Sequence, residues 1–246
     1  MKKIITLFGL MLCMFATAQE AVDTMYIYRN DNVIERIPVS KIDSVVFVTP
    51  VAPVTPQYEA VDLGLSVKWA AYNVGATKPE EYGGYYAWGE TEEKEDYSWG
   101  TYKWCDGSSN IMTKYCTHFN YGIFDNKTTL DLEDDVARVK WGGDWRMPTT
   151  EEQQELFNKC TWKWTALNGV KGYMITGPNG NSIFLPAAGF RDGTDVGNRD
   201  LGGGIWSSSL YSNLCYNAYC LSFSFSRKDL GYGYRYCGLS VRPVSK

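Results

Sequence analysis

The chain has 246 residues, of which 24 are basic and 28 acidic, and its only histidine is His118. This length suits one sizeable domain and a smaller module, and a hydrophobic content of 44% indicates a packed globular protein rather than a disordered chain. The net charge of −4 provides no basic footprint for nucleic acid. A single histidine excludes a metal site built from several histidines and argues against a Ser-His-Asp triad.

The first residues are typical of a secretory signal peptide. Lys2 and Lys3 precede an apolar run over residues 4–15, and residues 16–18 are small, as signal peptidase requires. We therefore expect a signal peptide over residues 1–18 and an exported mature protein that is periplasmic, cell-surface or extracellular. A lipid anchor at Cys13 is disfavoured because Leu12 stands where a small residue is expected. The run is too short for a membrane span, and no other stretch approaches that length.

Export changes the expected role of the cysteines. An oxidising compartment permits up to three disulfides among the six that follow the signal peptide, with fifteen possible pairings. The alternative is that several are free, buried and apolar in character. No tight pair of C-x-x-C motifs is present, which disfavours structural zinc. The six cysteines are Cys105, Cys116, Cys160, Cys215, Cys220 and Cys237.

Residues 19–49 are predicted to form a small β module. Strand-like residues at 25–27 and 33–37 flank turn-forming residues at 29–32, and a further strand is expected over 45–48. Three prolines spaced by three residues then favour an extended linker over residues 50–57. Such a module is marginal by itself, so we expect it to dock on the main domain or to add its strands to a partner sheet.

The main domain is expected over residues 58–246, and its helices are predicted in the first half. Leu132, Val136 and Val139 share one helical face, which suggests a helix over 131–140. Thr149 and Glu152 form a capping box that begins a second helix, ending near Cys160. An acidic stretch over residues 90–96 could bind calcium, but a solvated loop is favoured because no Asp-x-Asp repeat is present.

Strands dominate the second half of the main domain. Candidates are residues 67–70, 162–165, 172–176, 182–186, 205–208, 232–236 and 239–244, with a glycine-rich loop over 189–204. Residues 218–226 alternate strictly, with Tyr219, Leu221 and Phe223 on one side and Cys220 on the other, which indicates a half-buried strand. The predicted class is α+β, with two short helices and antiparallel strands.

Several motifs of the main domain resemble a known family. They lie in residues 58–69, 141–149, 181–191, 206–208 and 238–244. Together they are similar to the FISUMP (major paralogous) domain of exported proteins from gut-type bacteria. The resemblance implies a C-type-lectin-like fold, which is also similar to that of formylglycine-generating enzymes. Trp141, Trp145 and Trp206 are expected in an aromatic core, and Arg146, Arg191 and Arg242 are expected to brace loops.

The favoured function is ligand binding by a tyrosine-rich C-terminal face, without catalysis and without a cofactor. Tyrosine supplies rigid contact area and a hydroxyl at low entropic cost, while serine and asparagine add adaptable hydrogen bonds. The composition also resembles that of variable proteins from diversity-generating retroelements. The expected partner is a glycan or a cell-surface protein. The candidate contact residues are Trp206, Tyr211, Asn213, Tyr216, Asn217, Ser222, Ser224, Tyr232, Tyr234, Arg235 and Tyr236.

Three other interpretations remain open at this stage. Cys215 and Cys220 have the C-x-x-x-x-C spacing of the copper-binding pair in formylglycine-generating enzymes, and paired thiolates suit copper(I). Against this, the arginine-rich motif of those enzymes is absent, and the two cysteines could simply form a disulfide. A surface-assembly subunit and a plain scaffold with tyrosines on a wet sheet are the other two.

Overall fold

The computed structural model describes residues 24–29, 32–42 and 58–246, which belong to two separate compact units. The predicted signal peptide, the predicted strand over residues 45–48 and the linker over residues 50–57 lie outside the described residues. In the first unit, β1 (Thr24–Arg29) and β2 (Asn32–Pro38) form an antiparallel hairpin that continues into the 3₁₀ turn η1 (Val39–Lys41). The two predicted strands of the small module are therefore confirmed.

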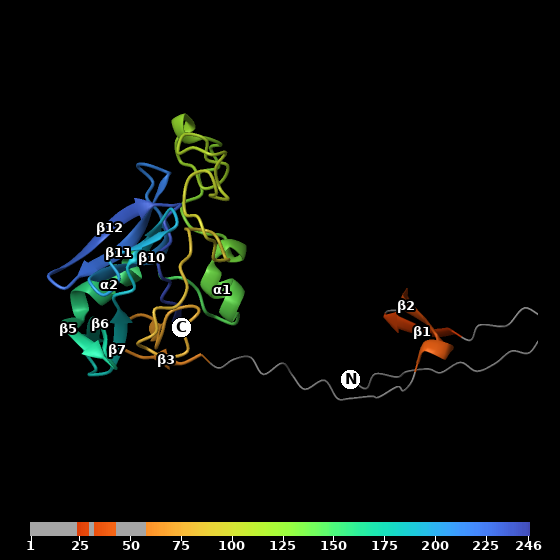
Figure 1. Cartoon of the computed structure of the whole chain (residues 1–246), viewed down its shortest axis with the longest axis horizontal. Coiled ribbons are helices and arrows are strands. Elements are labelled where there is room, and N and C mark those ends of the chain that lie inside the picture. The colour runs from red at the N-terminus through yellow and green to blue at the C-terminus, as the bar shows by residue number, and fades with distance from the viewer. Residues whose placement is uncertain (1–23, 30–31, 43–57) are drawn as a thin grey trace, which may run out of the picture. The chain divides into compact units, whose positions relative to one another are not determined.

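The second unit is built from short antiparallel sheets (Figure 1). Its strands pair in the orders β10-β11-β12, β5-β6-β7, β13-β4-β3 and β8-β9, and its two α-helices are α1 and α2. This arrangement confirms the predicted α+β class. The strands are β3 (Ala60–Val61), β4 (Lys68–Ala70), β5 (Thr161–Leu167), β6 (Val170–Thr176), β7 (Ser182–Pro186), β8 (Phe190–Asp192), β9 (Asp195–Gly197), β10 (Gly202–Leu210), β11 (Asn217–Ser224), β12 (Arg227–Tyr234) and β13 (Val244–Ser245).

The sequence predicted the bounds of one helix well and those of the other poorly. Helix α2 (Thr150–Lys159) begins with the predicted capping box between Thr149 and Glu152. Helix α1 (Val136–Trp141) is shorter than predicted, because Asp135 is extended and caps it after the 3₁₀ turn η3 (Leu132–Asp134). The predicted apolar face was therefore wrong. Leu132 and Val139 are exposed, and α1 instead buries Val136, Ala137 and Trp141.

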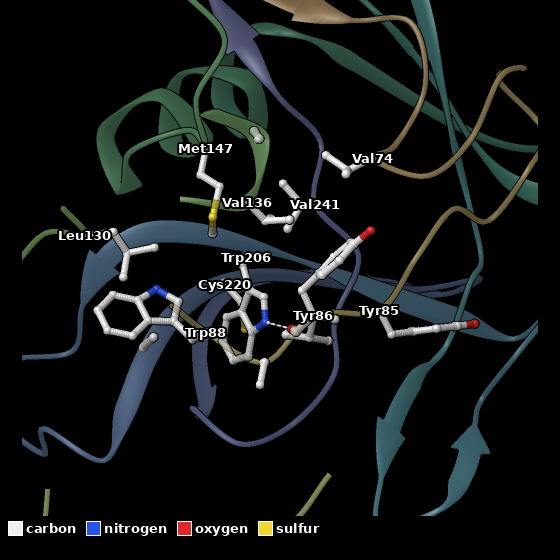
Figure 2. Close-up of a cluster of buried hydrophobic side chains, with 14 of the residues drawn as sticks. Val74, Tyr85, Tyr86, Trp88, Leu130, Val136, Met147, Trp206, Cys220 and Val241 are labelled. Atoms are coloured by element: carbon white, nitrogen blue, oxygen red, sulfur yellow. Dashed lines mark hydrogen bonds between the residues drawn. The ribbon is translucent and has the colours of Figure 1, made fainter. Parts of the chain in front are cut away.

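Two hydrophobic clusters lie on opposite sides of the sheet β10-β11-β12. One packs α2 and the sheet β5-β6-β7 against Leu221 and Phe223 of β11. The other is rich in aromatic rings and contains Trp88 and Trp206, which are both fully buried (Figure 2). The Trp206 indole nitrogen donates to the Tyr86 carbonyl at 2.8 Å, so this large ring is both packed and hydrogen-bonded. The predicted aromatic core is confirmed, since Trp141 and Trp145 are buried in the same cluster.

Arg242 ties the last segment of the chain to the rest of the domain. Its guanidinium is fully buried and donates to the Asn73 side chain and to the carbonyls of Ala70, Ala71 and Phe184. Burial without a carboxylate partner lowers the pKa of Arg242 to about 9. The predicted bracing role is confirmed here. It also holds for Arg146, which pairs with Glu152, and for Arg191, which donates to the carbonyls of Glu95 and Thr194.

The acidic stretch over residues 90–96 was expected to be a solvated loop, and this was wrong for Glu90. Its side chain is buried, pairs with Lys94 at 2.9 Å and accepts from the Lys103 backbone nitrogen at 2.8 Å. Glu93 accepts from the Tyr85 backbone nitrogen at 2.9 Å. These carboxylates hold together a long segment without regular structure, which needs side-chain acceptors for its backbone donors.

Candidate ligand-binding face

Aromatic side chains line one face of β11 and β12. Tyr219 lies directly opposite Tyr232 in the antiparallel register, and residues in such a pair project to the same face. Tyr232 is 52% exposed and Tyr234, two residues further on, is 50% exposed. Tyr211 stacks on Tyr232 with ring centroids 4.1 Å apart and meets Tyr219 edge-on at 5.2 Å. These rings therefore form one contiguous group.

The aromatic surface continues beyond the strands. Tyr234 stacks with Tyr236 at 5.7 Å and lies 6.2 Å from Tyr216. Trp99 meets Tyr236 edge-on at 4.8 Å, and Tyr121 meets Tyr216 edge-on at 5.1 Å. We call this surface the tyrosine face, and it comprises Tyr211, Tyr216, Tyr219, Tyr232, Tyr234 and Tyr236 with Trp99 and Tyr121 at its borders.

Sequence reasoning missed Trp99 and Tyr121. Both lie in the long irregular segment between residues 90 and 130, far along the chain from the predicted site. Tyr121 belongs to the 3₁₀ turn η2 (Phe119–Tyr121), and Trp99 has no regular element at all. Only their aromatic residue type could have suggested that they belong to the face, because no sequence periodicity relates them to the strands of the sheet.

The tyrosine face is the uncovered part of a sheet surface whose other part is buried. Leu221 and Phe223 follow Tyr219 at two-residue steps and therefore share its face. They are buried in the cluster with α2, whereas Tyr219 is half-buried. Helix α2 thus covers one end of the sheet and leaves the other end to the tyrosines.

The opposite side of β12 explains its alternation of glycine and tyrosine. Gly233 lies between Tyr232 and Tyr234 and faces Trp206, so a Cβ atom there would stand 3.3 Å from the indole. Glycine therefore lets the indole approach the strand closely. The buried Trp206 ring supports the sheet from below, while the tyrosines occupy the exposed side.

Three predicted contact residues are buried and do not belong to the exposed face. Trp206 and Arg235 have no exposed surface, and Asn217 is 3% exposed. Trp206 is part of the aromatic core. Arg235 directly follows β12, and it points to the same inner side as Gly233 because the two are two residues apart. Asn217 lies opposite Tyr234 at the start of β11.

Arg235 holds together three segments under the tyrosine face. Its Nε donates to the Tyr102 hydroxyl at 2.8 Å, and its Nη1 donates to the carbonyls of Cys215 at 2.7 Å and Tyr115 at 3.1 Å. Its Nη2 donates to the Lys114 carbonyl at 3.0 Å. The guanidinium also lies 4.9 Å from the Trp88 ring centroid, a cation–π arrangement. Arg235 is therefore a structural residue, not a ligand contact.

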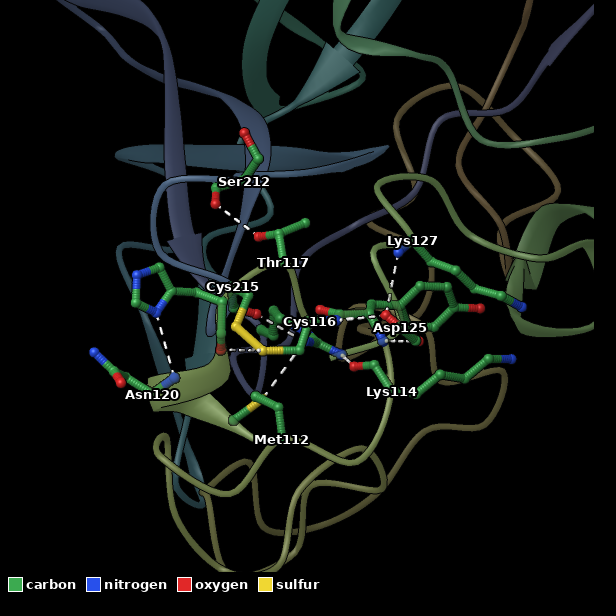
Figure 3. Close-up of a disulfide and its surroundings, with 12 residues drawn as sticks. Met112, Lys114, Cys116, Thr117, Asn120, Asp125, Lys127, Ser212 and Cys215 are labelled. Atoms are coloured by element: carbon green, nitrogen blue, oxygen red, sulfur yellow. Dashed lines mark hydrogen bonds between the residues drawn. A yellow bond between two sulfur atoms is a disulfide. The ribbon is translucent and has the colours of Figure 1, made fainter. Parts of the chain in front are cut away.

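A disulfide between Cys116 and Cys215 ties the segment before β11 to the loop that carries Tyr121 (Figure 3). The two Cα atoms are 5.2 Å apart. Beside the bridge, the Asp125 carboxylate accepts from the backbone nitrogens of Tyr115 and Cys116, both at 2.8 Å. This cross-link brings Tyr121 next to Tyr216, which follows the bridged cysteine.

The alternative in which Cys215 pairs with Cys220 does not match the bonding of these cysteines. Cys215 bonds to Cys116, while Cys220 is free and buried in the core. The alternation predicts an outward side for Cys220, but β11 is the central strand and both of its faces are buried there. Burial raises the pKa of the Cys220 thiol to about 12, which keeps it protonated.

Ser222 and Ser224 are also separated from the tyrosines. They alternate with Leu221 and Phe223 and so project from the opposite side of β11. Ser222 is exposed and Ser224 is half-buried. Asn213, by contrast, is exposed beside the face, with its amide 3.5 Å from the Tyr211 hydroxyl.

Two hydroxyls of the tyrosine face, those of Tyr216 and Tyr236, have a pKa above the usual value for tyrosine. Burial raises the pKa of Tyr216 above its usual value. Burial also raises the pKa of Tyr236, with further contributions from Cys237 and Asp192. Both of these phenols therefore stay protonated near pH 7 and can donate as well as accept a hydrogen bond.

One group of carboxylates elsewhere has the spacing of a metal site. Ligand atoms of Asp131, Glu133 and Asp134 lie within 4.8 Å of one another. Lys114 already occupies the centre of this group, with its Nζ 2.7 Å from Asp131 and 2.6 Å from Asp134. An ammonium in this place balances the carboxylates and makes the group a salt-bridge network.

The comparisons with known proteins found no matching family model, no matching curated protein and no matching solved structure. The resemblance to the FISUMP domain and the C-type-lectin-like fold therefore stay predictions. Among the described residues, no helix has the length and apolar character needed to cross a bilayer.

Proposed function

We propose that this protein is an exported, non-catalytic binding protein that recognises a glycan or a cell-surface protein through the tyrosine face. The observation that carries the proposal is the contiguity of the rings, since Tyr211, Tyr232, Tyr234 and Tyr236 form two stacked pairs on a half-covered sheet. Contact surfaces rich in exposed tyrosine are typical of recognition proteins.

The support under the face favours recognition over a plain scaffold. The Arg235 hydrogen bonds and the Cys116–Cys215 bridge fix the segments that carry the rings. A surface held in this way loses little conformational entropy when a ligand binds, which increases affinity.

The proposal is tested by screening the mature chain against arrays of glycans and cell-surface proteins. We expect hits that the double variant Tyr232→Ala/Tyr234→Ala abolishes. The matched control is Val139→Ala, which removes an exposed apolar side chain from α1, on another part of the domain. Absence of hits, or hits that survive the double variant, would contradict the proposal.

The face is also proposed to be diversified, as the resemblance to retroelement variable proteins implies. The geometry then restricts where variation can occur on β12. Near-copies of the final codons in neighbouring DNA should differ at Tyr232, Tyr234 and Tyr236 but keep Gly233 and Arg235. Variation at the two buried positions as frequent as at the tyrosines would argue against diversification of this face.

A further inference from the structure

A groove lies on the side of the sheet β10-β11-β12 that is opposite to the tyrosine face. It has a volume of about 470 Å³, within the range of about 300–1,000 Å³ seen for small-molecule sites. Its floor is formed by two rows that cross the three strands in register. One row is Gly204, Ser222 and Asp229, and the other is Gly202, Ser224 and Arg227.

Several polar side chains that line this groove are free to bind a ligand. The hydroxyls of Ser222 and Ser224 and the side-chain amide of Asn198 make no hydrogen bond within residues 58–246. Arg227 donates to Oδ2 of Asp229 at 2.8 Å, which leaves Oδ1 available. The groove therefore offers two hydroxyls, an amide and one carboxylate oxygen to a ligand.

Apolar side chains also line this groove. They include Phe190 and Leu239, and Leu201 and Phe225, which are 56% and 65% exposed. Glycines at 202 and 204 leave the β10 side of the floor without side chains. Aromatic rings beside free hydrogen-bonding groups match a ligand with an apolar face and a rim of hydroxyls.

We infer that this groove is a carbohydrate-binding site, separate from the tyrosine face, that takes a single pyranose ring or a sugar chain end. The free Oδ1 of Asp229 accepts from a sugar hydroxyl, the serines and Asn198 bind others, and Phe190 or Phe225 packs on the C–H face of the ring. The Arg227–Asp229 pair is internally balanced, which disfavours a phosphate or another charged ligand. The groove's polar floor disfavours a lipid chain.

The inference is tested by saturation-transfer NMR of the mature chain with free glucose, galactose, mannose, N-acetylglucosamine, fucose and rhamnose. We expect at least one of these sugars to bind. Asp229→Asn should weaken that binding at least tenfold, and Ser222→Leu, which fills the floor with an apolar side chain, should abolish it.

Two control variants test whether sugar binding depends on the groove itself. Ser226→Leu makes the same change at an exposed residue outside the lining, and Val139→Ala removes an exposed apolar side chain from α1. Both should bind the sugar with unchanged affinity, and all four variants should keep the thermal midpoint within a few degrees. Failure of all six sugars to bind, persistence of binding in Ser222→Leu, or loss in either control would overturn the inference. Because none of these variants changes a residue of the tyrosine face, failure here leaves the proposed function standing.

Discussion

The two sides of β12 differ in function, because its outer side carries exposed tyrosines and its inner side packs on the core. Tyr232, Tyr234 and Tyr236 point outward, and the first two are about half exposed. Gly233 and Arg235 alternate with them and point inward, against Trp206 and into a network of buried carbonyls. Adjacent positions therefore serve separate purposes, so changes on the inner side should affect stability and changes on the outer side should affect binding.

The largest expected effect on stability comes from Arg235. Arg235→Met leaves the buried carbonyls of Tyr115, Cys215 and Lys114 without their donor, and each such loss costs about 1–3 kcal/mol. We expect the free energy of unfolding to fall by on the order of 3 kcal/mol or more, measured by denaturant titration. Arg227→Met, at a side chain that is 75% exposed, is the matched control and should change it by less than about 0.5 kcal/mol. Equal losses of unfolding free energy in the two variants would show that the hydrogen bonds of Arg235 do not stabilise the domain as proposed.

The disulfide should come next in magnitude. Cys116→Ser/Cys215→Ser should lower the free energy of unfolding by about 2–4 kcal/mol, because the bridge closes a loop with a sequence separation of 99 residues. A reducing agent should lower the thermal midpoint of the wild type but not that of the double variant. Cys105→Ser, at a free cysteine, is the control. A wild-type midpoint that does not respond to reduction would contradict the pairing.

A smaller effect is expected at Gly233. A Cβ atom there would press on the Trp206 ring, and overpacking of this kind costs about 1–3 kcal/mol. Gly231 lies on the same side of the strand but has no atom within 4 Å of a Cβ position. Thermal unfolding should therefore show a loss for Gly233→Ala and little change for Gly231→Ala, and the reverse order would refute the packing described.

Local signals in the sequence predicted much of the fold. The capping box placed α2 correctly, and the strands predicted over residues 162–165, 172–176 and 182–186 lie within β5, β6 and β7. These features depend on residues close together in the chain. Helix α1 was misplaced because Asp135 interrupts it, and an N-cap inside an apolar pattern is easily overlooked.

The candidate site was predicted only in part. Alternation shows which side chains of a strand share a side, but it does not show which side is buried. The tyrosine-rich composition placed Tyr232 and Tyr234 in one site, but composition could not show that Arg235 points into the core, and alternation could not show that Cys220 is buried. The Cys116–Cys215 pairing and the approach of Trp99 depend on contacts between distant segments. No local pattern encodes those contacts.

The most direct test of the account compares Tyr234→Ala with its neighbour Gly233→Ala, using a ligand identified by the arrays. The dissociation constant and the thermal midpoint are measured for both variants, at a temperature where both are folded. We predict that Tyr234→Ala weakens binding at least tenfold with little change in the midpoint, while Gly233→Ala lowers the midpoint and binds normally. A Tyr234→Ala variant that binds as tightly as the wild type would contradict the claim that the outer side of β12 is the recognition surface.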